Sequence, residues 1–154
     1  MSTTTITKQF RAEIAHRLPN HKGACQRLHG HSYRFEVTVA GQVEQVESGM
    51  ALDFKVLKEI VEPVIKGWDH SLILWEGDPL LKFLRGECAR VELKFLREAM
   101  SIIIFPRIPT AENMANYLGQ FIRQELPVGI AITSVRVWET TTSYAEWRND
   151  NAQG

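Results

Sequence analysis

The chain has 154 residues, of which 44% are apolar and 23% are charged, as is typical of one folded domain and not of a disordered chain. Its 18 basic and 18 acidic side chains cancel, so the composition offers no basic excess for nucleic acid and no polybasic segment for a membrane surface. No apolar run approaches the roughly 20 residues that span a bilayer, and the start lacks the apolar core of a signal peptide. We therefore expect a single cytoplasmic domain over residues 1–154, with no nucleic-acid or membrane partner. In that compartment Cys25 and Cys88 are expected to be reduced.

Two segments near the N-terminus alternate apolar and polar residues, which is the pattern of a strand with one buried face. In residues 4–16 the apolar positions include Phe10, Ala12 and Ile14. In residues 31–39 they are Tyr33, Phe35, Val37 and Val39. Both segments are predicted to be strands.

Helical spacing of apolar residues follows in two places. Residues 54–65 form one such stripe after Asp53, which is a typical helix N-cap, and Pro63 is expected to bend or shorten this helix. Residues 114–122 form a second stripe, and Thr110 is the N-cap candidate before it.

Shorter elements are predicted between and after these helices. Asp78-Pro79 is expected to start a short helix, and the alternation of Val91, Leu93 and Phe95 indicates a strand. Further strands are expected over residues 102–105 and 131–137. The pattern predicts an α+β domain, with an antiparallel sheet of about four strands and two main helices on one face.

Three of the five histidines fall on apolar strand faces. His16 continues the buried face of the first strand, and His29 and His31 share that of the second. If the two strands pair, the three imidazoles converge, and three neutral imidazoles with an open fourth position are typical of catalytic zinc. A single buried histidine is more often a hydrogen-bonded core residue, but an HGH aligned with a third histidine favours a metal.

Cys25 precedes His29 by four residues, in the loop that enters the second strand. Its basic neighbours are His21, Lys22 and Arg27, and positive charge lowers the pKa of a thiol. The segment therefore predicts a cysteine that acts as a base or nucleophile, whereas Cys88 lies in a stretch with no motif.

Two further acidic positions are candidates. Asp69 and His70 are adjacent after the first helix and could relay protons. Glu139 ends the apolar face of the last strand, where a carboxylate needs donors. A basic side chain that forms a plain salt bridge with Glu139 and a ligand with a guanidine-like edge are equally good candidates for that donor.

Together these segments resemble the 6-pyruvoyl-tetrahydropterin synthase and 6-carboxy-tetrahydropterin synthase family. The resemblance covers most of the chain in order, through AEIAHRL, CQRLHGHSY, LDFKVLK, WDHSLIL, PTAEN and VRVWET. It implies the tunnel fold and a homo-oligomer, most often a hexamer, with active sites at subunit interfaces.

The resemblance also implies residue roles. The Zn²⁺ ligands would be His16, His29 and His31. The catalytic residues would be Cys25, Asp69, His70 and Glu139, with Asp69 and His70 supplied by a neighbouring subunit. Glu139 would grip the pterin ring. Thr110 is a further substrate-binding candidate, and Lys22 and Arg27 are candidates for the triphosphate on their charge alone, as other basic residues also are.

The family substrate is 7,8-dihydroneopterin triphosphate. Three residues separate Cys25 from His29, which resembles the branch that forms 6-carboxy-5,6,7,8-tetrahydropterin, acetaldehyde and triphosphate for queuosine biosynthesis. Two alternatives remain, a 6-pyruvoyl-tetrahydropterin synthase and a non-catalytic pterin- or zinc-binding paralogue. The main departure from the compact members is the longer stretch over residues 76–108.

Overall fold

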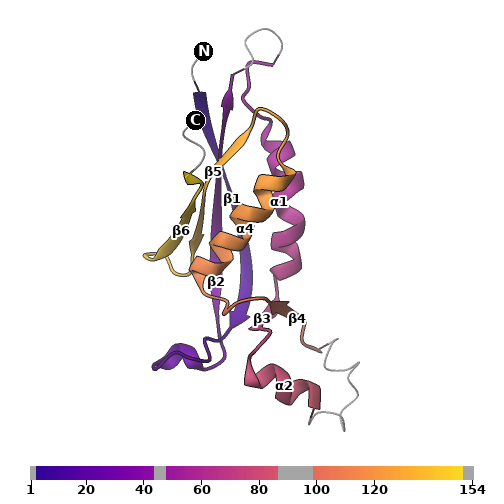
Figure 1. Cartoon of the computed structure of the whole chain (residues 1–154), viewed down its shortest axis with the longest axis vertical. Coiled ribbons are helices and arrows are strands. Elements are labelled where there is room, and N and C mark those ends of the chain that lie inside the picture. Colours follow the sequence, from indigo (N-terminus) through magenta and orange to yellow (C-terminus); the bar gives the residue numbers. More distant parts are fainter. Residues whose placement is uncertain (1–2, 44–47, 87–98, 151–154) are drawn as a thin grey trace.

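A six-stranded sheet in the order β4-β3-β1-β2-β5-β6 forms the centre of the computed structural model, which describes residues 3–43, 48–86 and 99–150 (Figure 1). The strands are β1 (Thr3–His16), β2 (His29–Gln42), β3 (Ser71–Trp75), β4 (Ile102–Phe105), β5 (Ala131–Trp138) and β6 (Tyr144–Arg148). The helices are α1 (Phe54–Trp68), α2 (Pro79–Gly86) and α4 (Ala111–Glu125), with a 3₁₀ turn, η1 (Ala24–Gln26).

Helices α1 and α4 cover the same face of the sheet, as Figure 1 shows. The core lies between them and the sheet, and its fully buried residues include Phe35, Val37, Leu57, Val61, Met114 and Leu118. Polar side chains such as Arg11 and Glu36 occupy the alternate strand positions. Among the described helices, none combines the length and the apolar composition that crossing a membrane requires.

The helix starts agree with the sequence predictions. The Asp53 carboxylate accepts from the backbone N–H of Lys55 at 2.8 Å, and the Thr110 hydroxyl accepts from that of Asn113 at 3.2 Å. Helix α1 is not shortened at Pro63, whose side chain is exposed, and continues to Trp68.

The predicted sheet was wrong in size and in strand direction. Strand β3 pairs in parallel with β1, and β4 pairs in parallel with β3. Four of the five residues in Ser71–Trp75 are buried, so the segment lacks the alternation that identifies a half-exposed strand. Helix α1 provides the crossover that a parallel strand requires. The predicted strand at Val91, Leu93 and Phe95 lies outside the described residues.

The strand predicted over residues 131–137 is present as β5, but its side chains do not alternate regularly between buried and exposed positions. The buried residues of β5 are Ile132, Val135 and Val137. Thr38 pairs with Ser134 while Val39 pairs with Ile132, so Thr133 is an extra residue in the strand. This irregularity is a β-bulge, which shifts the side-chain alternation by one residue.

Candidate metal centre

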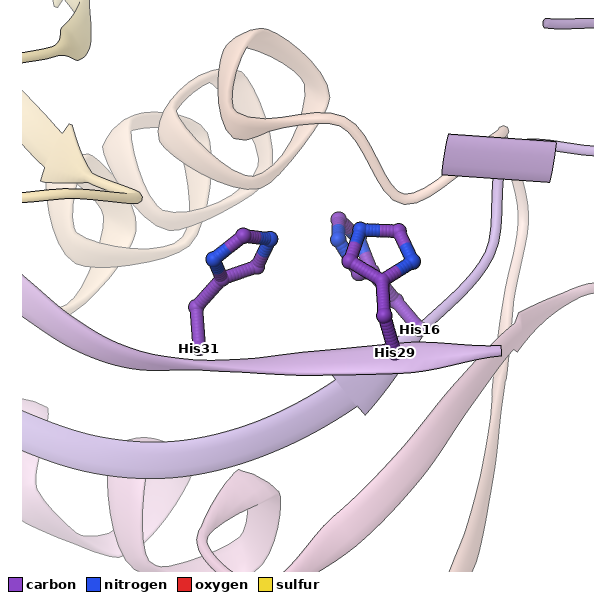
Figure 2. Close-up of side chains that lie close together, drawn as sticks. All are labelled: His16, His29 and His31. Atoms are coloured by element: carbon purple, nitrogen blue, oxygen red, sulfur yellow. The ribbon is translucent and has the colours of Figure 1, made fainter. Parts of the chain in front are cut away.

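The antiparallel register of β1 and β2 brings the three predicted histidines together. His16 lies directly opposite His29, and His31 lies opposite Ile14. The ligand atoms of the triad lie within 4.8 Å of one another, and the His16 side chain is fully buried. Figure 2 shows His29 and His31 projecting from the same face of β2 toward His16.

Two backbone carbonyls determine which nitrogens of the triad carry protons. The Nδ1 atom of His16 is 2.8 Å from the carbonyl oxygen of Pro109, and that of His29 is 2.7 Å from the carbonyl oxygen of Arg27. Because a carbonyl only accepts, each Nδ1 donates, and in the neutral ring the lone pair lies on Nε2. Both histidines are therefore oriented as metal ligands.

The remaining nitrogens fit a metal ion. Within the described part of the chain, the Nε2 atoms of His29 and His31 are buried and have no hydrogen-bond partner. Burial also lowers the pKa of His31, which favours the neutral imidazole. Unpartnered buried nitrogens are rare unless a ligand uses them, and three imidazole donors with one open position are the ligand set of a catalytic zinc.

Glu139 borders the triad from the end of β5. Its Oε1 atom is 3.3 Å from Nε2 of His16 and 3.5 Å from Nε2 of His31. The same oxygen accepts a hydrogen bond from the Tyr33 hydroxyl at 3.2 Å. Where His16 carries a second proton, its Nε2–H donates to this oxygen, and that hydrogen bond lowers the pKa of Glu139 although burial opposes it, so the carboxylate is charged at neutral pH.

Cys25 lies in η1, in the loop between β1 and β2. Its carbonyl oxygen accepts from the N–H of Leu18 at 2.8 Å, which ties this loop to the end of β1. The thiol is half-buried. Lys22 and Arg27 are exposed in the same loop.

Asp69 and His70 are attached to the backbone of β1 and not to the triad. The Asp69 carboxylate accepts from the N–H of Glu13, and the N–H of His70 donates to the carbonyl of Glu13, both at 2.7 Å. The hydrogen bond from Glu13 and that from His70 lower the pKa of Asp69. His70 is 78% exposed and lines a cavity of about 440 Å³ together with Glu13, Ser32 and Ser101.

The His70 backbone is strained. Its φ of 57° makes it the only non-glycine residue with positive φ among those described, and this region costs a non-glycine residue free energy. The ring nitrogen Nδ1 lies 2.9 Å from the Asp69 carboxylate, so the strained turn presents an acid–imidazole pair at the surface.

Comparison with known proteins agrees with this arrangement. The family model of 6-pyruvoyl tetrahydropterin synthase matches residues 5–150. The chain belongs to this family. A 6-carboxy-5,6,7,8-tetrahydropterin synthase of Haemophilus influenzae is 32% identical over 146 residues, covering 93% of this chain and 97% of that protein. The protein of the same name from Aquifex aeolicus is 33% identical over 165 residues, covering 94% and 98%.

Solved structures share this fold. An uncharacterized protein of Wolinella succinogenes superimposes with a TM-score of 0.82 at 23% identity, covering 97% of this chain and all of that one. The 6-pyruvoyl tetrahydropterin synthase of Caenorhabditis elegans gives 0.67 at 22% identity, covering 97% and 98%. The tunnel fold expected from the family is thus confirmed, with six strands in place of about four.

Relative to the sequence predictions, the structure gathers some residues and separates others. The triad and Glu139 lie together, and Thr110 directly follows Pro109, whose carbonyl oxygen binds His16. Asp69 and His70 do not belong to this cluster: they hydrogen-bond to the backbone of Glu13, and His70 lines one cavity with His31.

Tyr33 and the Pro109 carbonyl were missed by sequence reasoning. For Tyr33 a signal exists, because it places a hydroxyl on an otherwise apolar strand face two residues after the HGH. A backbone carbonyl distant in sequence from His16 gives no such signal.

Proposed function

We propose that the chain is a zinc-dependent lyase that converts 7,8-dihydroneopterin triphosphate to 6-carboxy-5,6,7,8-tetrahydropterin, acetaldehyde and triphosphate, a reaction of queuosine biosynthesis. The observation that carries the proposal is the convergence of three imidazoles beside the charged carboxylate of Glu139, with the buried Nε2 atoms of His29 and His31 lacking hydrogen-bond partners in the described residues. The names of the relatives from Haemophilus influenzae and Aquifex aeolicus support the 6-carboxy product.

The triad would hold Zn²⁺ through His16, His29 and His31. The ion would supply a Lewis acid for the hydroxyls of the substrate side chain. His16 and His29 keep their Nε2 lone pairs directed at this position because their Nδ1 atoms donate to backbone carbonyls. The geometry thus supports a permanent ligand set that does not need to rearrange when substrate binds.

Cys25 would act as the base. Its thiolate, carried by the loop between β1 and β2, would take a proton from the substrate side-chain carbon that bears a hydroxyl. Lys22 and Arg27 would contact the triphosphate, for which their exposed positions in the Cys25 loop leave their charges accessible.

Glu139 would hold the pterin ring. A charged carboxylate can accept two parallel N–H donors from the amidine-like edge of the ring. Because Glu139 lies beside the triad, a ring bound there would lie next to the metal. Thr110 would contribute to the same pocket, since it adjoins the Pro109 carbonyl that binds His16.

Asp69 and His70 would move protons to and from the side-chain oxygens in the active site of a neighbouring subunit. The exposure of the His70 side chain supports this assignment, as does the fact that neither residue belongs to the described histidine cluster. A homo-oligomer, most simply the hexamer of the family, would complete each site.

The test is product identification. Purified protein loaded with zinc is incubated with 7,8-dihydroneopterin triphosphate, and the products are identified by mass spectrometry, with Cys25→Ala as the inactive control. Acetaldehyde and the carboxy-pterin are expected. A pterin that retains all three side-chain carbons would identify the 6-pyruvoyl reaction in its place, and no turnover at all would leave the chain as a non-catalytic paralogue.

A further inference from the structure

Tyr33 places a hydroxyl inside the core next to the metal centre. Its side chain is 1% exposed, and its ring stacks on Phe35 with centroids 6.0 Å apart. The other residues on this face of β2 beyond it are apolar, so a phenylalanine would fill the same space. A buried hydroxyl is unfavourable unless it has a hydrogen-bond partner.

Two acceptors compete for the single Tyr33 proton. The hydroxyl oxygen is 3.2 Å from Oε1 of Glu139 and 3.3 Å from Nε2 of His16. The other His16 nitrogen, Nδ1, is also 3.3 Å away, but it donates to the Pro109 carbonyl. A phenol has an ordinary pKa of about 10, so the hydroxyl carries one proton to donate at neutral pH.

A metal ion on the triad removes one of these acceptors. The lone pair of His16 Nε2 is then donated to the ion, and the Glu139 carboxylate is the acceptor that remains for the hydroxyl. We propose that Tyr33 is a positioning residue that couples the binding of a metal ion by the histidine triad to the orientation of Glu139. This inference rests on the proposed function, in which Glu139 holds the pterin ring.

The coupling has a consequence for binding. When the Tyr33 hydroxyl donates to Oε1, the carboxylate is fixed about its terminal torsion and presents Oε2 to an incoming ring. Pre-orienting a binding group removes part of the free-energy cost of ordering it on binding. By linkage, zinc and the pterin then strengthen each other's binding.

The experiment uses 6-methylpterin, which has neither the hydroxyls nor the phosphates through which the substrate side chain would contact zinc. Its dissociation constant is measured by fluorescence titration on metal-free and zinc-loaded protein. Because a hydrogen bond to a charged group is worth about a factor of ten or more, zinc should tighten binding roughly tenfold in the wild type. In Tyr33→Phe the effect of zinc should disappear, while zinc stoichiometry and circular dichroism stay unchanged.

Tyr117→Phe is the matched control. Tyr117 lies on α4, is 41% exposed and packs against Trp68 and Phe105, so this variant should keep the full effect of zinc. Tyr33→Met, which also lacks the hydroxyl, provides a second test if the phenylalanine variant fails to fold.

The possible results distinguish a failure of the coupling from a failure of the proposed function. If zinc leaves 6-methylpterin binding unchanged in the wild type, or if Tyr33→Phe keeps the effect, the coupling is wrong. If zinc weakens binding, Glu139 is a zinc ligand and the coupling is also wrong. If the wild type binds no 6-methylpterin with or without zinc, the proposed pterin pocket fails and the coupling fails with it.

Discussion

His70 and Glu13 are joined through their backbones, with the N–H of His70 donating to the carbonyl of Glu13 at 2.7 Å. The contact fixes a residue with positive φ at the surface, and the Asp69 carboxylate strengthens it by accepting from the N–H of Glu13. Because His70 is held in a strained conformation and exposed, we expect its partner to be another copy of the chain.

Subunit complementation tests this arrangement. Cys25→Ala and His70→Ala chains should each be inactive, but co-assembled in equal amounts they should regain activity, because about a quarter of randomly assembled interfaces would combine an intact Cys25 with an intact His70. The measurement is turnover after joint refolding or co-expression.

The matched control pairs Cys25→Ala with His29→Ala. Both residues belong to the same half of the site, so mixing should restore nothing. Activity of a strictly monomeric protein, or equal recovery in both mixtures, would show that each chain carries a complete site.

Metal content tests the triad. Purified protein should contain about one zinc per chain by elemental analysis, and His29→Ala should lose most of it because two imidazoles bind zinc far more weakly than three. His21→Ala is the control, since His21 is exposed in the loop and its Nδ1 accepts from the N–H of Gly23 at 2.9 Å. Full zinc retention in His29→Ala would remove the ligand assignment.

The two cysteines should differ in their effect on turnover. Cys25→Ala should abolish it while leaving zinc content and thermal stability close to wild type, because the thiolate has no substitute in the loop. Cys88→Ala, in a segment outside the described residues, should be nearly silent. Steady-state rates and zinc analysis of both variants decide, and equal losses would mean that the base is misassigned.

The triad could be predicted from the sequence because it depends only on strand parity. His16, His29 and His31 each continue an apolar face, and pairing of β1 with β2 brings those faces together. The helix caps at Asp53 and Thr110 could also be predicted from the sequence, since a cap is a local interaction between a side chain and the next turn.

Features that depend on distant contacts could not be predicted. The parallel pairing of β3 is determined by the crossover through α1, and a five-residue strand with four buried residues carries little periodicity. The bulge at Thr133 can be recognised only from the pairing of β5 with β2. In that pairing the Thr133 hydroxyl donates to the Thr38 carbonyl at 3.0 Å. The attachment of Asp69 and His70 to Glu13 likewise joins residues far apart in sequence.

The last strand was missed because it is short, and its attachment to β5 is partly electrostatic. Glu146 on β6 lies 2.9 Å from Nε of Arg136 on β5 and 2.7 Å from Arg148. Although burial opposes it, hydrogen bonding to Arg148 and Arg136 lowers the pKa of Glu146 below its usual 4.5.

Stability should therefore depend on pH through Glu146. A carboxyl whose pKa is lowered on folding stabilises the protein above its unfolded pKa, and this contribution is lost as the pH falls through the folded value. Glu146→Gln should cost less than about 1 kcal/mol at pH 7, because the arginines are partly exposed. The difference from wild type should shrink below pH 4.5 in urea unfolding, and a difference independent of pH would contradict the assignment.

Packing of β6 against α4 depends on a glycine. A Cβ atom built on Gly119 would overlap the ring of Trp147, and both residues lie where the strand and the helix meet. Gly119→Ala should therefore destabilise the fold by roughly 1–3 kcal/mol, since the indole must move or the helix must shift. Gly67→Ala is the control, because a Cβ at this position of α1 meets nothing within 4 Å and should stabilise the protein by about 0.4–1 kcal/mol. Urea unfolding of both variants should thus give free-energy changes of opposite sign, and a Gly119→Ala variant as stable as wild type would show that β6 is free to move away from α4.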